Sequence, residues 1–128
     1  MNYEVAKECT MLSDEEKIIF PDVVSRLNKA DIDLYYADLL VPNKTYYAKN
    51  EAYAVPCSSK VEKKVSDVFN KDKVVQAIQL IQAGQIKYQE FIQQIMEAGV
   101  ISYLVFIKGR KAIYFGKRVE QHIEEFPS

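Results

Sequence analysis

The sequence predicts an α+β fold in which two similar units, each a helix followed by three strands, form an antiparallel sheet of about six strands covered by helices. Three observations support this prediction. Residue types recur at a fixed offset of 68 positions, apolar residues at helical spacing twice precede aromatic segments, and turn residues divide those segments into strand-sized pieces.

The repeat is carried mainly by aromatic residues. Tyr35 is matched by Tyr103, and Tyr46-Tyr47 is matched by Tyr114-Phe115. The apolar stripe that precedes them is repeated as well: Val23, Val24 and Leu27 correspond to Phe91, Ile92 and Ile95. Two such units can pair about a pseudo-twofold axis, and the seam between them is then the natural place for a ligand or partner site.

The length of 128 residues fits a single domain, residues 1–128, with repeats at about 20–56 and 88–127 and a helical connection at about 60–84. The chain has 17 basic and 18 acidic residues, a formal net charge of −1. This balance gives no general attraction to nucleic acid or to anionic lipid, so binding of either kind would need a local patch.

The expected compartment is the cytoplasm, and no membrane association is expected. The first residues do not form a secretory signal, and the longest nearly apolar run, Val100 to Ile107, is too short to span a bilayer. Cys9 and Cys57 lie far apart and are expected to be free thiols in a reducing compartment.

Two helices are predicted before the first strands. Ser13-Asp14-Glu15-Glu16 has the residue types of a capping box, which predicts that a helix begins there. Pro21 lacks the amide hydrogen of an interior helical position, so we expect a break and a second helix over about Pro21 to Lys29.

The first unit continues with a hairpin and a third strand. Ile32 to Val41 and Thr45 to Ala48 are joined by turn residues, and a further strand is expected over about Ala52 to Val55. The segment from Lys60 to Asp67 fits either a short helical turn or a linker.

The second unit has clearer boundaries. Asn70 can cap a helix that ends near Gly84, and a helix with apolar residues from Tyr88 to Ile95 ends at Gly99. The expected strands follow at Val100 to Lys108, Lys111 to Phe115 and Gln121 to Phe126. The pattern does not decide between one sheet and two three-stranded sheets.

The chain resembles a bacterial and prophage family of unknown function that is called YdfO-like and often labelled phage envelope protein. The resemblance rests on Phe20-Pro21-Asp22-Val23-Val24, Thr45-Tyr46-Tyr47, Tyr88, Phe91, Ala98 to Tyr103, Gly109-Arg110, Ile113 to Gly116, His122 and Phe126-Pro127. It implies a compact α+β fold and a mobile-element origin, and it brings no activity, cofactor or catalytic residue.

This chain departs from the family at two turns. Family members tend to have a glycine in the tight turn before each third strand, whereas this chain has Lys49-Asn50-Glu51 and Lys117 to Glu120. The register of both third strands is therefore open. Asp31 also stands where the second unit has Gly99, which is acceptable because aspartate enters the left-handed region more readily than most residues.

The leading site hypothesis places a ligand or protein partner at the sheet face or the seam, with Tyr35, Tyr46, Tyr103, Tyr114 and Arg110 as binding residues. Tyrosine rings supply apolar area with a polar end, and arginine adds an anion-binding group. The same rings also suit packing on half-buried strands.

His122 is the only histidine and therefore the candidate acid or base if the protein is an enzyme acting with a nearby tyrosine or carboxylate. The structural alternative is a strand histidine with a hydrogen bond at the surface. No metal or cofactor is predicted, because one histidine and two remote cysteines do not form a zinc site and no phosphate-binding glycine loop is present.

A third alternative is weak nucleic-acid binding through the basic hairpin from Lys108 to Arg118, which flanks two aromatic residues. Nucleic acid remains an unlikely partner by net charge. The prediction from sequence is therefore a small soluble, non-enzymatic binding module for an unknown protein or small molecule, with homodimers through exposed edge strands as one option.

Overall fold

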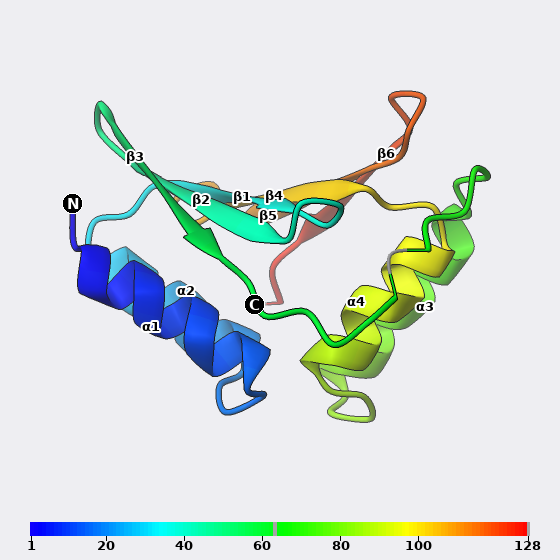
Figure 1. Ribbon diagram of the computed structural model, residues 1–128, viewed down its shortest axis with the longest axis horizontal. Coiled ribbons are helices and arrows are strands. Elements are labelled where there is room, and N and C mark those ends of the chain that lie inside the picture. Colours follow the sequence, from blue (N-terminus) through cyan, green and yellow to red (C-terminus); the bar gives the residue numbers. More distant parts are fainter. Residues whose placement is uncertain (63, 128) are drawn as a thin grey trace.

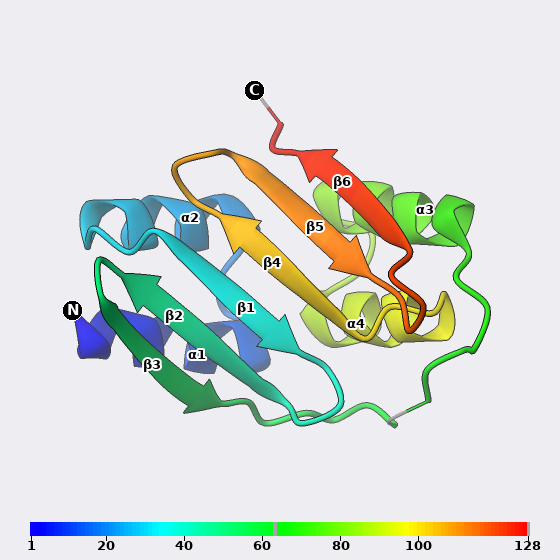
Figure 2. The same cartoon turned by 90° about the horizontal axis from the view of Figure 1, so that it is seen from above.

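One six-stranded antiparallel sheet carries all four helices on a single face (Figures 1 and 2). The computed structural model describes residues 1–62 and 64–127. The elements are α1 (Tyr3–Asp14), α2 (Phe20–Lys29), β1 (Leu34–Asp38), β2 (Asn43–Ala48), β3 (Glu51–Pro56), α3 (Lys71–Gln82), α4 (Tyr88–Glu97), β4 (Ser102–Phe106), β5 (Lys111–Phe115) and β6 (Gln121–Glu125). The strand order is β3-β2-β1-β4-β5-β6, so the predicted α+β class is confirmed and the strands form one sheet.

The order helix, helix, strand, strand, strand occurs twice along the chain. The bounds of α3, α4 and β4 lie 68 positions after those of α1, α2 and β1. The prediction had one helix in each unit, and each in fact has two. In Figure 1 the pair α1 and α2 lies below the sheet on the left, and the pair α3 and α4 lies below it on the right.

The prediction that a helix begins at Ser13 is wrong, because α1 ends there. Glu16 has a left-handed φ of 60°, its N–H donates to Ser13 O, and the Lys17 N–H donates to Leu12 O at 2.8 Å. These bonds satisfy the last carbonyls of a helix. The residues that α1 buries are mostly small or polar, namely Ala6, Cys9, Thr10, Ser13 and Asp14, so no apolar stripe indicates the helix in the sequence.

The other three helices were predicted correctly. Pro21 lies in the first turn of α2, and the Asn70 side chain accepts a hydrogen bond from Lys73 N at the start of α3. Left-handed residues end each of these helices, with φ of 57° at Asp31, 72° at Gly84 and 98° at Gly99. The aspartate therefore takes the conformation that glycine takes at the equivalent place in the second unit.

The segment between β3 and α3 contains neither helix nor strand within the part of the chain that the structure describes, which leaves out residue 63. From the end of β3 it leads to the side of α3 and α4 (Figure 1), and seen from above it follows the outer edge of the molecule (Figure 2). Ser66 N donates to Met96 O at 3.1 Å and Asn70 N donates to Ala98 O at 2.8 Å, so its end is fastened to the end of α4.

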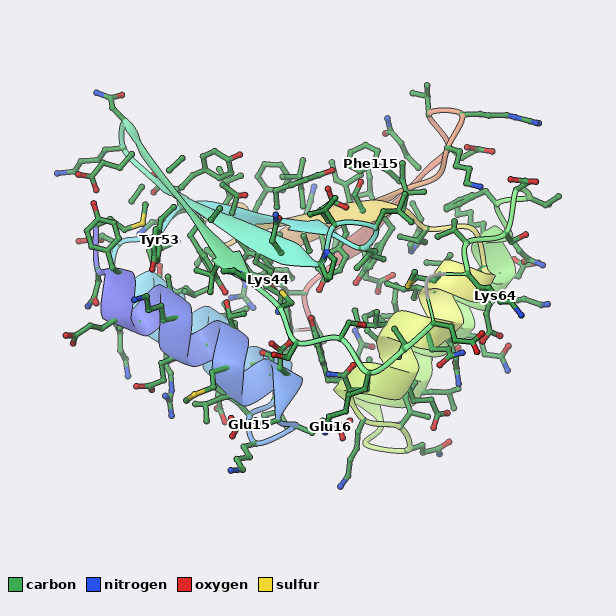
Figure 3. The ribbon with its side chains drawn as sticks, viewed as in Figure 1. Glu15, Glu16, Lys44, Tyr53, Lys64 and Phe115 are labelled. Atoms are coloured by element: carbon green, nitrogen blue, oxygen red, sulfur yellow. The ribbon has the colours of Figure 1, made fainter. Side chains whose placement is uncertain are left out.

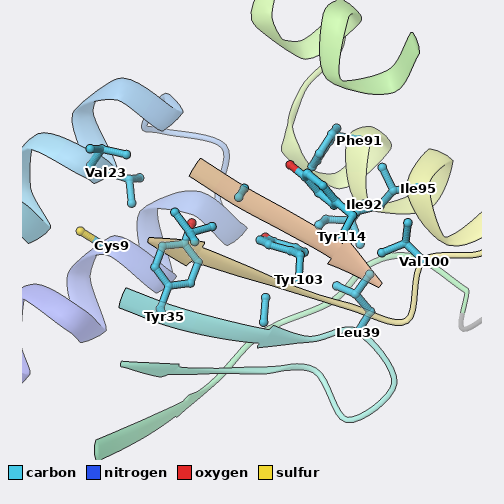
Figure 4. Close-up of a cluster of buried hydrophobic side chains, with 14 of the residues drawn as sticks. Cys9, Val23, Tyr35, Leu39, Phe91, Ile92, Ile95, Val100, Tyr103 and Tyr114 are labelled. Carbon is cyan, nitrogen blue, oxygen red and sulfur yellow. The ribbon is translucent and has the colours of Figure 1, made fainter. Parts of the chain in front are cut away.

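The two units meet at the antiparallel pair β1 and β4. Tyr36 lies opposite Leu104, and Tyr35 and Tyr103 lie one position to either side of that pair. Every second side chain of a strand points to the helix side, among them Tyr35, Tyr103 and Tyr114. Together with helix residues such as Phe91 and Ile95 of α4, these side chains form the core (Figure 4).

The third strands differ in register between the units. Tyr46 pairs with Tyr53, whereas the equivalent Tyr114 pairs with His122, which is 69 positions after Tyr53. The extra residue lies in the loop before β6, where Gly116 N donates to Glu120 O at 2.9 Å. Because the loop takes up the extra residue, His122 lies on the same face of the sheet as its counterpart Tyr53.

Candidate functional site

The four tyrosines predicted as binding residues form one row on the helix side of the sheet. Figure 4 shows three of them, Tyr35, Tyr103 and Tyr114. Their ring centroids are 5.4 Å apart for Tyr46 and Tyr35, 6.4 Å for Tyr35 and Tyr103, and 5.3 Å for Tyr103 and Tyr114. The row continues to His122, whose ring is stacked 6.4 Å from Tyr114. The rings that the repeat brings together are therefore neighbours across four strands.

These tyrosines are 1–7% exposed and pack beneath the helices. Burial raises the pKa of all four hydroxyls, so each stays protonated at neutral pH. Tyr46 also shares a 2.7 Å hydrogen bond with the buried Thr10 hydroxyl of α1. Their direct role in binding stays a prediction, and any ligand that reaches them must enter from the helix side.

Arg110 lies apart from the row, in the turn between β4 and β5. Its guanidinium lies 5.3 Å from the Phe126 ring centre and donates to Pro127 O at 3.3 Å. Three other residues of the basic hairpin are paired with carboxylates: Lys108 with Asp31, Lys111 with Glu125 and Lys117 with Asp67. These pairs neutralise much of the positive charge on which nucleic-acid binding was predicted to rest.

His122 is 9% exposed, and its Nε2 lies 2.8 Å from Glu124 Oε1. It is therefore a hydrogen-bonded histidine on the helix side of β6, more buried than the surface position expected for it. The Tyr114 ring covers it from one side. A catalytic role for this pair stays a prediction.

Lys44 is the residue that the sequence did not single out. It is the second residue of β2 and shares the helix side with Tyr46, which leaves it only 3% exposed (Figure 3). Its Nζ lies 4.7 Å from the Tyr88 ring centre and 5.6 Å from the Tyr35 ring centre. The ammonium thus lies against two aromatic faces, where cation–π attraction offsets part of its desolvation.

A small cavity of about 30 Å³ lies next to Lys44 and joins the two units. Asp14 at the end of α1 lines it, as do the hairpin between β1 and β2, Cys57 after β3, and Tyr88 and Gln89 at the start of α4. Gln89 Nε2 donates to Asp14 O at 3.0 Å, which connects the first unit to the second. The cavity therefore lies at the seam where a site was expected.

The carboxylate of Asp14 lines the same cavity and accepts from Ser58 N at 2.8 Å. Asp38 also lies at the cavity, but its side chain has the opposite parity to Lys44, and its carboxylate accepts from Leu40 N and Val41 N at 2.9 and 3.0 Å. Burial raises the pKa of Asp14 against the opposing effect of its backbone hydrogen bond and of Lys44. Among residues 1–62 and 64–127, no carboxylate is close enough to Lys44 for an ion pair, and no hydrogen bond to its ammonium is present.

A signal for Lys44 does exist in the sequence. Lys44 and Tyr46 are two positions apart on a strand, so they must point to the same face. The composition of Pro42-Asn43-Lys44, however, predicts a turn, so that the strand is expected to begin only at Thr45. In the structure β2 begins at Asn43, which brings the lysine into the sheet.

The described residues contain no group of three or more histidine, cysteine, aspartate or glutamate side chains arranged to hold a metal ion. No helix in that part of the chain has both the length and the apolar character needed to cross a membrane. Cys9 and Cys57 are both unpaired thiols, as expected.

Comparison with known proteins gives a family but no activity. A family model described as "Protein of unknown function (DUF1398)" matches residues 12–125. Relatives include "Uncharacterized protein Mb2035" of Mycobacterium bovis and "Uncharacterized protein Rv2012" of Mycobacterium tuberculosis, each 33% identical over 58 residues, or 45% of this chain. That match spans only 35% of the length of these curated relatives. The YdfO-like and phage envelope labels do not come with these matches and stay predictions.

Proposed function

Since this chain belongs to the DUF1398 family, whose description names no activity, we propose from the geometry that it is a non-enzymatic binding module for a small polar molecule at the seam. The observation that carries the proposal is Lys44, a residue only 3% exposed whose ammonium lies at a cavity and has neither a hydrogen-bond acceptor nor an ion-pair partner among the described residues.

An ammonium in an enclosed site without protein acceptors is costly, because it loses most of its hydration and gains only the attraction of nearby rings. No fully buried side-chain nitrogen or oxygen of the described residues lacks a partner, so the Lys44 Nζ keeps access to solvent at the cavity. A ligand oxygen in the cavity would supply the acceptor that the protein does not. The volume of about 30 Å³ exceeds the roughly 10–15 Å³ that one water requires, but it is too small for a whole metabolite. The cavity therefore suits the polar end of a ligand whose remainder lies at the surface.

The second unit offers an internal comparison. Ala112 is the second residue of β5, as Lys44 is of β2, and Phe126 follows β6 as Cys57 follows β3. Phe20 begins α2 as Tyr88 begins α4, and the Phe20 and Phe126 rings touch edge to face at 5.2 Å. At the equivalent position of the second unit the fold therefore packs apolar side chains. The lysine at the cavity is thus not needed for the fold to form.

The charges at the cavity favour a ligand that both donates and accepts hydrogen bonds. Lys44 needs an acceptor, whereas the Asp14 carboxylate has lone pairs left for a donor. A simple anion would meet this carboxylate, and a simple cation would meet Lys44. A zwitterion such as an amino acid offers a carboxylate to Lys44 and an ammonium to the carboxylate of the cavity. A carboxamide is a neutral group that likewise both accepts and donates hydrogen bonds.

The test is a titration followed through backbone amide chemical shifts with glycine, acetamide and acetate as probes. We expect glycine, and more weakly acetamide, to shift amides near Asp38, Lys44, Ser58 and Gln89, with dissociation constants on the order of millimolar for ligands of this size. Acetate should have a smaller effect because the Asp14 carboxylate repels it.

The matched variants are Lys44→Met, which keeps the length of the side chain, and Lys111→Met, which removes an exposed lysine from the equivalent hairpin. Lys44→Met should abolish the shifts and Lys111→Met should preserve them. Equal shifts in both variants, or no shifts with any probe up to about 100 mM, would contradict the proposal. Dispersed spectra of each variant confirm that it is folded.

A further inference from the structure

The face of the sheet opposite the helices is uncovered by any element of the described chain (Figure 1). We call it the open face. Its members share the parity that points away from the core: Leu34, Tyr36, Asp38, Asn43, Thr45, Tyr47, Ala52, Ala54, Ser102, Leu104, Phe106, Lys111, Ile113, Phe115, Gln121, Ile123 and Glu125. An antiparallel sheet with one face in water normally carries polar residues there, and this one is largely apolar.

The apolar residues of the open face are contiguous across strands. Tyr36 of β1 lies opposite Leu104 of β4, Leu104 lies opposite Ile113 of β5, and Ile113 lies opposite Ile123 of β6. Ile123, at the edge, is 55% exposed. A continuous apolar surface of this kind marks an interaction site more often than a solvated face.

The charges on the open face are already satisfied within the chain. Lys111 is paired with Glu125 at 3.7 Å, and Asp38 accepts two backbone N–H bonds. Among the described residues of the six strands, no further charged side chain points to this side. The occupant is therefore selected by apolar fit, which argues against a nucleic acid or a strongly charged peptide.

We propose that the occupant is a second copy of this chain, packed open face to open face. The apolar row is centred on the Tyr36–Leu104 pair, where the two units meet, so a twofold operation can bring the same residues of two copies together. In Figure 1 the hairpin ends of β2-β3 and β5-β6 rise on both sides, which gives the face a saddle shape. Two such twisted sheets fit when they cross at nearly right angles.

The size of the open face suits a weak dimer. Six strands spaced about 4.8 Å apart and roughly 17 Å long cover about 490 Å² per copy before the relief of the side chains is counted. Two copies then bury roughly 980 Å², below the ~1,200 Å² of standard specific interfaces and in the range of transient association. We therefore expect a reversible dimer with a dissociation constant on the order of 100 μM. The Lys44 cavity lies on the other side of the sheet and is not part of this interface.

The test is sedimentation equilibrium of the full chain over a wide concentration range. Wild-type protein should show a monomer–dimer equilibrium. Ile123→Glu and Thr45→Lys, which place charges at the edge and in the middle of the open face, should weaken the dimer at least tenfold. The control is Val68→Glu, because Val68 is 72% exposed but lies in the connection before α3, outside the open face.

A wild-type protein that stays monomeric at about 1 mM would overturn the proposal. So would equal dimerisation of Ile123→Glu and wild type. A monomer that binds an apolar dye, and loses that binding in Ile123→Glu but not in Val68→Glu, would assign the face to another partner and equally reject the second copy.

Discussion

At the scale of single residues, the direction of a side chain on a strand decides its role. Tyr46 is buried in the core, whereas its neighbour Tyr47 belongs to the open face. Lys44 has the parity of Tyr46, which places it on the helix side, where Tyr88 of α4 packs against it. The alternation of period two therefore distributes otherwise similar residues between a packed row and a surface.

Cys57 provides a prediction at this scale. Burial raises the pKa of its thiol to about 11 from the ordinary value of 9.0. Because the thiolate is the reactive species, a pKa two units higher leaves about 100-fold less of it at pH 8. We expect iodoacetamide to alkylate Cys57 correspondingly slowly, with a rate that increases as pH rises toward 11.

The measurement is mass spectrometry of the peptides that contain Cys9 and Cys57 after timed alkylation at several pH values. The same chain in denaturant serves as the reference for an accessible thiol. If Cys57 reacts at pH 8 as fast in the folded protein as in denaturant, the thiol is not shielded as described.

At the scale of elements, all four helices end with the same pair of backbone hydrogen bonds. The N–H groups after α3 and α4 donate to carbonyls of the last turn, as they do after α1 and α2. Glycine occupies the left-handed position in the second unit, and Glu16 and Asp31 occupy it in the first. The backbone conformation is common to these ends although the residue differs.

Gly84 and Gly99 permit a matched test of these helix ends. Both have positive φ, so alanine at either position costs about 1 kcal/mol through backbone strain. A methyl group at Gly84 meets nothing within 4 Å, whereas one at Gly99 would lie 2.6 Å from Val68 O and 2.8 Å from Phe69 Cα.

We therefore expect Gly84→Ala to lower the free energy of unfolding by about 1 kcal/mol, and Gly99→Ala to lower it by about 2 kcal/mol more. Urea denaturation of the two variants and of wild type provides the comparison. If the two substitutions lowered the free energy of unfolding equally, the backbone at Val68 and Phe69 would be able to move away from the added methyl group without destabilising the protein.

At the scale of the whole molecule, the sheet is held together by its central pair. β1 and β4 come from different units, are each paired on both sides, and join residues nearly 70 positions apart. β3 and β6 are edge strands with one neighbour each. The amide groups of the centre can open only when the two units separate, whereas those of the edges can open locally.

This arrangement predicts the order of amide hydrogen exchange. The slowest amides should be those of β1 and β4, with protection close to the full free energy of unfolding, and the outward amides of β3 and β6 should exchange faster. Exchange followed by NMR at several pH values tests this order. Slower exchange in β3 than in β1 would mean that the units do not depend on each other as the topology indicates.

Much of the local structure could be predicted from the sequence. Apolar spacing indicated α4, Asn70 and Gly84 marked the ends of α3, and turn residues separated the strands. Helix α1 could not be found in this way, because what it buries is small or polar and forms no stripe. The seam was predicted as the place of a site, but its residues were not: Lys44 had been interpreted as part of a turn.

The sequence by itself determined where α2, α3 and α4 end, which residues of a strand share a face, and that two similar units follow one another. Only the tertiary structure decided that β1 joins β4 in one sheet, that all helices cover the same face, and that Lys44 is enclosed beside Tyr88 while Tyr36 and Leu104 are left open. The physical reason is the sequence distance over which the interactions act. Turns, helix ends and side-chain periodicity depend on residues a few positions apart, whereas burial depends on which distant parts of the chain pack together.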